Sequence, residues 1–156
     1  MKIIGNGGHA AVVRDVARFL AHEPDGHFIA VGDNRSRQRE ARRRPRARFV
    51  ILIHPWAYVA PDVKIGAGTI IMAGAIVQPT CVIGRHVIVN TNSVVEHHCR
   101  IGDFVHIGPG AHLCGGVKVG TGALIGVGVG IAPGAKIPAG SLVKARRLEI
   151  EPLPGH

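Results

Sequence analysis

A branched aliphatic residue recurs at every sixth position from Ile53 to Val143, sixteen times without an exception. The series is Ile53, Val59, Ile65, Ile71, Val77, Ile83, Val89, Val95, Ile101, Ile107, Leu113, Val119, Ile125, Ile131, Ile137 and Val143. A period of six matches neither the 3.6-residue turn of an α-helix nor the two-residue alternation of a half-buried strand. It is typical of a β-solenoid built from hexapeptides. A thin solenoid has no deep pocket of its own, so any site is expected on its surface, between copies or against an added domain.

The spacing predicts a triangular coil of three hexads, with one short strand on each side. The aliphatic residue should point inward, and a second series of mostly small residues follows it four positions later. Glycine, asparagine, aspartate and proline collect between the two, where the chain must turn a corner. Fifteen complete hexads give about five coils. At the usual strand spacing, such a stack is roughly 24 Å tall.

The residues before the repeat predict a small α/β module. Residues 2–5, 27–31 and 48–53 are expected to be strands, and residues 10–21 and 35–44 are expected to be helices. A strand, a glycine-rich turn and a helix begin a Rossmann-like nucleotide-binding unit. Three strands are too few for a complete unit, so we predict a truncated one that packs against the first coils.

We divide the chain into a module at 1–52, a solenoid at 53–147 and a tail at 148–156. No stretch approaches about 18 consecutive apolar residues, so no membrane span is expected. The apolar run after Lys2 is interrupted at once by Gly5-Asn6-Gly7-Gly8, which is unlike a signal peptide. We therefore predict a cytoplasmic protein.

The net charge of +9 is concentrated in one segment, because residues 35–48 hold eight arginines and a single acid, Glu40. No aromatic residues interleave with these arginines to stack on bases, so we do not expect nucleic acid as a partner. Two interpretations remain open, a solvated helix face and capture of an anionic ligand such as a nucleotide or coenzyme A. Cys81 and Cys99 fall in the inward small-residue series, which favours small buried side chains over a disulfide or a metal site.

Two stretches carry a more specific pattern. Residues 90–111 read NTNSVVEHHCRIGDFVHIGPGA, residues 115–120 read GGVKVG, and the amino-terminal turn ends in Gly-Gly-His at 7–9. This combination resembles the sugar O- and N-acetyltransferases of the left-handed β-helix superfamily, related to sialic acid O-acetyltransferase and bacterial 4-amino-sugar N-acetyltransferases. The resemblance implies a left-handed parallel β-helix, acetyl-CoA as co-substrate, and transfer to a sugar or sugar-nucleotide acceptor. It also implies a homotrimer with the donor between neighbouring solenoids, and no metal.

The resemblance also implies roles for individual residues. His97 would be the general base, and His98 stands where many relatives have an acid. The predicted donor-binding residues are His106, Gly115, Gly116 and Val127. The predicted acceptor-binding residues are Gly7, Gly8, His9 and Gly32. Independently of the resemblance, an 18-residue coil places Gly115 over His97 and Gly116 over His98, which leaves room for a thioester and exposes backbone N–H groups.

Several features depart from the family pattern. The module is short, the acid after the base is missing, and the tail lacks the usual closing segment. Lys144, Arg146 and Arg147 could bind coenzyme A phosphates instead, or could block edge-to-edge pairing at the end of the sheet. The alternative function is therefore a non-catalytic hexapeptide-repeat scaffold or binding protein. Stabilisation by acetyl-CoA would separate the two hypotheses, because a bound ligand raises the melting temperature.

Overall fold

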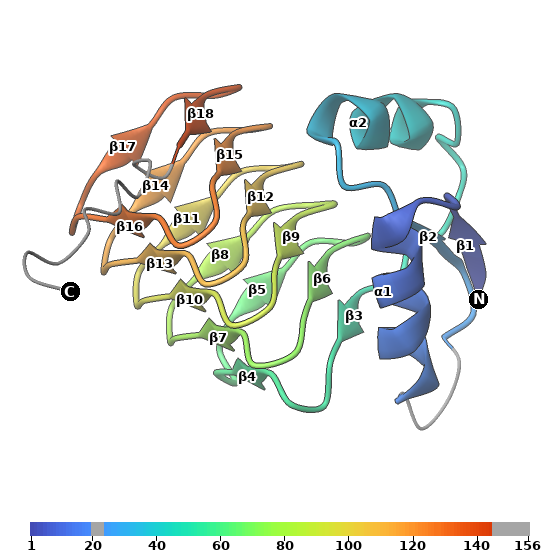
Figure 1. Cartoon of the computed structure of the whole chain (residues 1–156), viewed down its shortest axis with the longest axis horizontal. Coiled ribbons are helices and arrows are strands. Elements are labelled where there is room, and N and C mark those ends of the chain that lie inside the picture. The colour runs from blue at the N-terminus through green and yellow to red at the C-terminus, as the bar shows by residue number, and fades with distance from the viewer. Residues whose placement is uncertain (20–23, 145–156) are drawn as a thin grey trace, which may run out of the picture.

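The computed structural model describes residues 1–19 and 24–144, which form an amino-terminal α/β module followed by a long solenoid (Figure 1). The module contains β1 (Lys2–Ile4), α1 (Gly8–Arg18), β2 (His27–Ile29) and α2 (Asn34–Arg42). The solenoid strands each hold two residues: β3 (Leu52–Ile53), β4 (Tyr58–Val59), β5 (Lys64–Ile65), β6 (Ile70–Ile71), β7 (Ile76–Val77), β8 (Val82–Ile83), β9 (Ile88–Val89), β10 (Val94–Val95), β11 (Arg100–Ile101), β12 (His106–Ile107), β13 (His112–Leu113), β14 (Lys118–Val119), β15 (Leu124–Ile125), β16 (Gly130–Ile131), β17 (Lys136–Ile137) and β18 (Leu142–Val143). The predicted tail at 148–156, with Arg146 and Arg147, lies outside the described residues.

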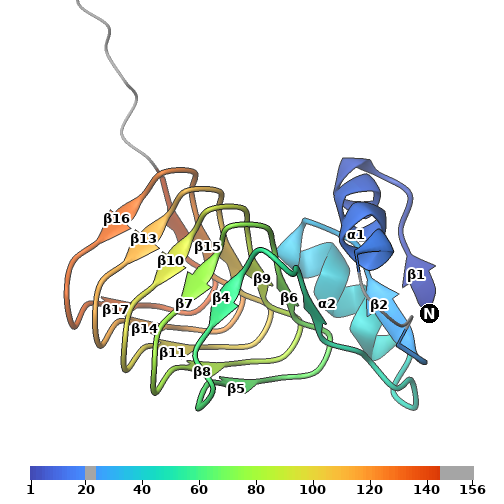
Figure 2. The ribbon, with the colours of Figure 1, turned by 90° about the horizontal axis from the view of Figure 1, so that it is seen from below.

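The solenoid is a triangular prism whose three sides are parallel sheets (Figure 2). The β10 sheet has the order β16-β13-β10-β7-β4, the β11 sheet β17-β14-β11-β8-β5, and the β12 sheet β18-β15-β12-β9-β6-β3. Each residue pairs with the one 18 positions further along, as Val94 does with His112 and Arg100 with Lys118. The predicted mainly β, parallel solenoid of about five coils is thereby confirmed.

The repeating aliphatic residues fill the axis of the prism. In the middle coils they are fully buried, as are the small residues four positions later, including Cys81 and Cys99. At the first coil no preceding coil covers the aliphatic residues, and Ile53 is 36% exposed. Each coil therefore buries its aliphatic layer by stacking on the next one, so the stability of the solenoid depends on contacts between neighbouring coils.

The module differs in detail from the prediction. Among its described residues, the sheet of the module consists of β1 and β2, with a bridge from His27 to Phe49. The predicted strand at 48–53 is divided, because Leu52 and Ile53 pair with β6 and so belong to the first coil. Helix α1 starts two residues earlier than predicted, at Gly8, and ends at Arg18.

The module packs on the outward face of the β12 sheet (Figure 1). Ala10, Val13 and Val16 share one face of α1 at helical spacing and are buried. They belong to the same apolar cluster as Ile70 and Ile88, the outward residues of β6 and β9. No helix in the described ranges is long and apolar enough to cross a membrane.

Arg37 of α2 fastens the module to the solenoid. Its side chain is 1% exposed. The guanidinium donates to the carbonyl oxygens of His86 and Phe104 in the solenoid, both at 2.9 Å, and to those of Val31 at 3.0 Å and Gly32 at 2.9 Å in the module. Nothing in the local sequence pattern of Arg37 distinguishes it from the neighbouring arginines.

Candidate active site

His97 and His98 lie at the corner of the prism between β10 and β11, and both are exposed. The backbone φ of His98 is +61°, the left-handed conformation that turns the chain at this corner. Its N–H donates to Thr80 Oγ1 at 3.1 Å, which ties the corner to the coil below. On the other side, the Gly116 N–H donates to the carbonyl oxygen of His97 at 2.9 Å.

Gly115 lies directly beside the ring of His97, as the 18-residue spacing predicted. A Cβ atom at this position would lie 2.6 Å from Cε1 and 2.8 Å from Nε2 of His97. Any side chain here would therefore displace the imidazole. The prediction for Gly116 needs one correction, because its N–H is already bonded to His97 and is not free for a ligand.

The two adjacent histidines contact each other through their Nδ1 atoms, which are 2.8 Å apart, with the rings at 89°. One Nδ1 must carry hydrogen and the other must accept it, so each ring fixes the tautomer of the other. This hydrogen bond leaves Nε2 of His97 on the side of Gly115. A nitrogen held beside a glycine in this way can remove a proton from a group bound there.

Glu96 is not the missing acid of this pair. Its Oε1 lies 3.7 Å from Nε2 of His112, an outward residue of the neighbouring strand β13. Since successive residues of a strand point to opposite faces, Glu96 and His112 share the outside of the β10 sheet. His112, to which the sequence assigned no role, is the residue that Glu96 faces.

His106 lies on the outward face of the β12 sheet, where the module meets the solenoid. The Asn90 Oδ1 accepts the Thr91 N–H at 2.8 Å, so the Asn90 amide nitrogen points to Nε2 of His106 at 3.0 Å. Nδ1 of His106 therefore carries the hydrogen and donates to the Gly32 carbonyl oxygen at 3.2 Å. Burial, with a further contribution from the charge of Arg37, lowers the pKa of His106 to about 4, so the ring is neutral at pH 7.

The glycine-rich turn forms a hollow of about 300 Å³ that the predicted acceptor-binding residues line. Gly7, Gly8, His9 and Gly32 all border it. Burial, followed by the charge of Arg37, lowers the pKa of His9 to about 4. His9 Nε2 is buried and has no hydrogen-bond partner among the described residues, and its ring centroid lies 6.4 Å from that of His106.

The predicted site residues therefore fall into separate groups within one chain. The His97 corner carries His98, Gly115 and Gly116, whereas His106 belongs to the seam with His9 and Gly32. Val127 is 65% exposed at the corner between β15 and β16. Asn90 and Arg37 were missed, since their partners lie many residues away along the chain. Among the described residues, no three or more His, Cys, Asp or Glu side chains lie together in a way that could hold a metal ion.

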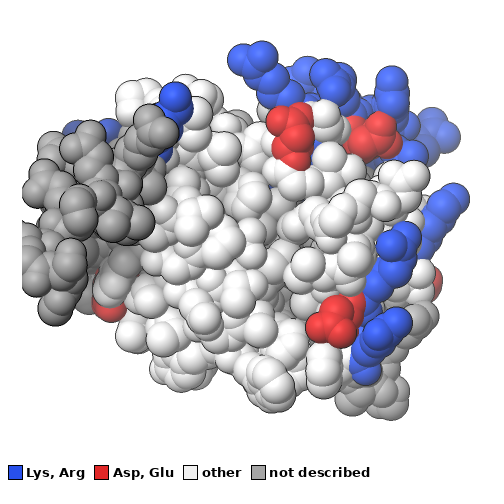
Figure 3. Space-filling view, in the orientation of Figure 1, with Lys and Arg blue, Asp and Glu red and all other residues white. Residues whose placement is uncertain are grey.

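The arginine segment divides between structural and exposed side chains. Lys and Arg gather over α2, at the upper right of the view in Figure 3. Arg43 and Arg44 pair with Glu40, whereas Arg35, Arg39 and Arg42 are exposed. A shallow hollow of about 180 Å³ between α2 and the solenoid includes Arg35.

Comparisons with known proteins agree with this architecture. The model of the bacterial transferase hexapeptide family (six repeats) matches residues 62–97 and 98–133. The acetyltransferase domain of PglB from Neisseria gonorrhoeae superposes with a TM-score of 0.86 at 31% identity, over 92% of this chain and 87% of that one. PerB from Caulobacter crescentus, solved with CoA and GDP-perosamine, has a TM-score of 0.85 at 36% identity, over 92% and 84%. A comparison with curated proteins finds no match.

This chain belongs to the hexapeptide-repeat acetyltransferases. The predicted family and the predicted class of enzyme, an acyltransferase, are both confirmed by these relatives. The PglB domain was also solved in complex with acetyl-CoA, at 31% identity, a TM-score of 0.79 and coverage of 92% of this chain and 95% of that one. The PglB domain thus binds acetyl-CoA, the acyl donor that the sequence predicted, and PerB binds CoA.

Proposed function

We propose that this hexapeptide-repeat acetyltransferase transfers an acetyl group from acetyl-CoA directly to the amino group of a nucleotide-linked amino sugar, with His97 as general base. The observation that carries the proposal is Nε2 of His97 held beside Gly115, a position without a side chain. An amino rather than a hydroxyl acceptor is favoured because PerB, at 36% identity, was solved with GDP-perosamine.

The reaction follows from the positions of these groups. The acceptor amine attacks the thioester carbonyl carbon while Nε2 of His97 takes a proton from the nitrogen. The C–N bond forms, the C–S bond breaks, and the proton on His97 passes to the departing thiolate. A positioned base of this kind contributes about 10²–10⁴-fold to the rate.

The oxyanion of the tetrahedral intermediate needs a hydrogen-bond donor. The Gly116 N–H is occupied by His97, but the Gly115 N–H donates to no acceptor within residues 1–19 and 24–144. Gly115 is therefore the donor we assign to the thioester oxygen. One such donor contributes roughly 10²–10³-fold.

His98 acts on His97 through the Nδ1–Nδ1 hydrogen bond. When Nε2 of His97 takes a proton, its Nδ1–H must donate to a neutral Nδ1 of His98. His98 thus orients the base, but it does not supply the negative charge that a carboxylate would place there.

A second copy of the chain would complete the site. The base corner lies between β10 and β11, whereas the acceptor hollow is lined by residues of the module, which packs on the β12 sheet (Figure 2). We therefore propose a homotrimer in which the corner of one solenoid meets the seam of its neighbour. The outward face of the β10 sheet supports this arrangement, because it carries Tyr58, Ile76 and Val94. Since activated sugars and acetyl-CoA are cytoplasmic metabolites, we place the enzyme in the cytoplasm.

The test is a panel of nucleotide-linked amino sugars with acetyl-CoA, followed by release of free thiol and by the mass of the product. We expect at least one 4-amino sugar nucleotide to gain an acetyl group, and we expect acetyl-CoA to raise the melting temperature. If acetyl-CoA stabilises the protein but no acceptor is acetylated, the acceptor assignment is wrong. If acetyl-CoA does not bind, the protein is a scaffold, as in the alternative hypothesis.

A further inference from the structure

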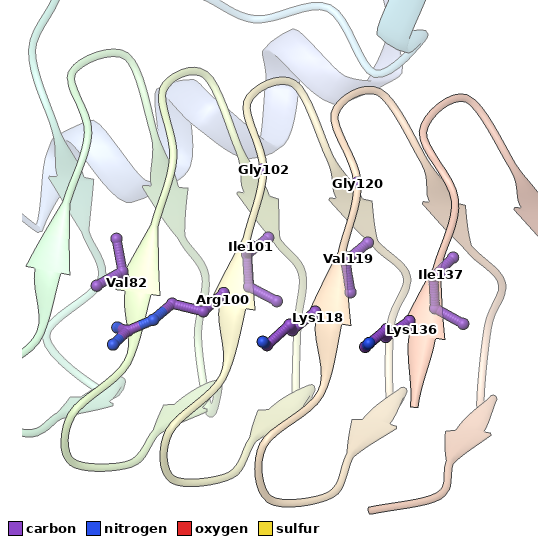
Figure 4. Close-up of a pocket in the computed structure, with 9 residues that line it drawn as sticks. All are labelled: Val82, Arg100, Ile101, Gly102, Lys118, Val119, Gly120, Lys136 and Ile137. Atoms are coloured by element: carbon purple, nitrogen blue, oxygen red, sulfur yellow. The ribbon is translucent and has the colours of Figure 1, made fainter. Parts of the chain in front are cut away.

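Two of the three cysteines lie on neighbouring coils, directly behind the corner that carries His97. The Val82 N–H donates to the Cys99 carbonyl oxygen at 3.0 Å, so Cys81 and Cys99 stand one coil apart in the same column. Neighbouring rungs are about 4.8 Å apart, and the Cα atoms of disulfides are about 4.4–6.8 Å apart. Both side chains are buried in the solenoid and are free thiols. Figure 4 shows Val82 and Arg100, the residues that follow them on β8 and β11.

Both thiols are bonded to the backbone of the proposed catalytic corner. Cys81 Sγ donates at 3.0 Å to the carbonyl oxygen of Glu96, the residue before the base. Cys99 Sγ donates at 3.3 Å to the carbonyl oxygen of Cys114, the residue before Gly115. A disulfide has no S–H group, so linking the two sulfurs would remove both hydrogen bonds. The backbone segments that hold the base and Gly115 would then lose these anchors.

Cys81 is the more reactive of the two thiols. It lines an open hollow of about 260 Å³ together with Arg100. Arg100 donates to the Thr80 carbonyl oxygen at 3.2 Å, which holds its guanidinium close to Cys81. Contact with the Cys99 thiol, together with the charge of Arg100, lowers the pKa of Cys81, whereas contact with Cys81 and burial raise the pKa of Cys99. A thiol of lowered pKa beside a second cysteine is typical of redox-sensitive pairs.

We propose that Cys81 and Cys99 form a peroxide-sensitive thiol pair, whose oxidation to a disulfide stops acetyl transfer at the adjacent corner. The effect on catalysis rests on the proposed function, whereas formation of the disulfide does not. Cys81 is only 1% exposed, so the hollow admits a small oxidant such as hydrogen peroxide rather than a protein.

The oxidation takes place in two steps. The Cys81 thiolate attacks one oxygen of hydrogen peroxide, the O–O bond breaks, and a sulfenic acid forms while the other oxygen leaves as water with the proton of the thiol. The Cys99 sulfur then attacks the sulfenic sulfur, the S–S bond forms, and the S–O bond breaks. The departing oxygen takes the Cys99 proton and leaves as a second water. The two sulfurs together lose two electrons, and the peroxide is reduced.

The disulfide can be mapped directly, because trypsin separates the three cysteines. Residues 65–85, 86–100 and 101–118 each form one tryptic peptide with a single cysteine. Reduced full-length protein is treated with hydrogen peroxide, the remaining thiols are alkylated, and the peptides are analysed by mass spectrometry without reduction. We expect the peptides 65–85 and 86–100 to be linked. Wild-type protein in which they stay unlinked would overturn the inference.

The third cysteine provides the matched control. The residues one coil before and after Cys114 are Glu96 and Ala132, so no cysteine stands over it. Cys114→Ala should therefore leave the link in place, whereas Cys81→Ala should abolish it. Alanine occurs at other positions of the same inward series, so the fold accepts this substitution. A link in wild type that involves the peptide 101–118 would contradict the pairing.

The effect on the corner is measured in two ways, after catalase has removed the peroxide. With an acceptor found in the panel above, oxidation should lower the wild-type kcat at least tenfold, and dithiothreitol should restore it. In Cys81→Ala, peroxide should change kcat by less than about twofold. Without any acceptor, the NMR signals of the His97 and His98 rings should shift when the disulfide forms.

A mapped disulfide that leaves both kcat and the ring signals unchanged would overturn the link to the corner. If the reduced enzyme acetylates no acceptor, the proposed function fails. The peptide map and the ring signals still decide the present inference in that case, because neither depends on turnover.

Discussion

Replacing Arg37 with methionine should loosen the amino-terminal module from the solenoid. Methionine is of similar length and fills the buried space, but it removes the guanidinium that bonds to the carbonyl oxygens of His86, Phe104, Val31 and Gly32. A buried acceptor without a partner costs about 1–3 kcal/mol. Burial of the charge, which lowers the pKa of Arg37 to about 10, offsets part of that loss. We therefore expect a net destabilisation of about 3 kcal/mol, and a melting temperature lower by roughly 6–12 °C.

The matched control is Arg42→Met, because Arg42 is an exposed arginine in the same helix. Differential scanning calorimetry gives the melting temperatures, and hydrogen exchange shows which part opens. Faster exchange should appear in β1, β2 and α1, while the buried coils stay protected. Equal melting temperatures for the two variants would refute the argument that Arg37 fastens the module.

Three further predictions concern the corner and the seam. Gly115→Ala should reduce the steady-state kcat at least tenfold by displacing His97, and an unchanged kcat would show that the base is not held there. His98→Glu should retain most activity, since a carboxylate can also accept the Nδ1–H of His97; a loss as large as that of His98→Ala would contradict this role. Burial, aided by the charges of Arg85 and Arg37, lowers the pKa of His86 to about 4, below its unfolded value of 6.5. The unfolded chain therefore binds more protons than the folded one. The free energy of unfolding should decrease as the pH falls from about 6.5 towards 4. Urea unfolding of wild type and His86→Leu should show a shallower pH dependence in the variant.

The repeat was readable from the sequence because it depends on local periodicity. A six-residue period fixes which side chains point inward, and an 18-residue coil fixes which residues lie over one another. The position of Gly115 beside His97 followed from that arithmetic. The same arithmetic could not show that the Gly116 N–H is used by His97, since spacing does not give hydrogen bonds.

The contacts between the module and the solenoid could not be predicted from local sequence patterns. Arg37 bonds to carbonyl oxygens 49 and 67 residues away, and its local pattern matches that of the exposed arginines around it. Leu52 belongs to the predicted strand at 48–53 of the module, but pairing with Ile70 draws it into the first coil. Tertiary contact overrode local pattern in both cases.

The outward face of the β11 sheet also illustrates what stacking adds. In the sequence, Arg100, Lys118 and Lys136 are isolated charges in three different repeats. In the structure they are consecutive rungs of one sheet, beside the corner that carries His97. A repeat of 18 residues thus brings widely spaced residues together on one continuous surface.

The most direct test of the account is the kcat of His97→Ala at saturating acetyl-CoA and acceptor, measured beside CoA affinity and oligomeric state. We predict a loss of kcat of at least about 10²-fold, with oligomeric state and CoA affinity unchanged, because the ring acts as a base and is exposed within the chain. A variant that keeps most of its kcat would contradict the assignment of His97 as the base.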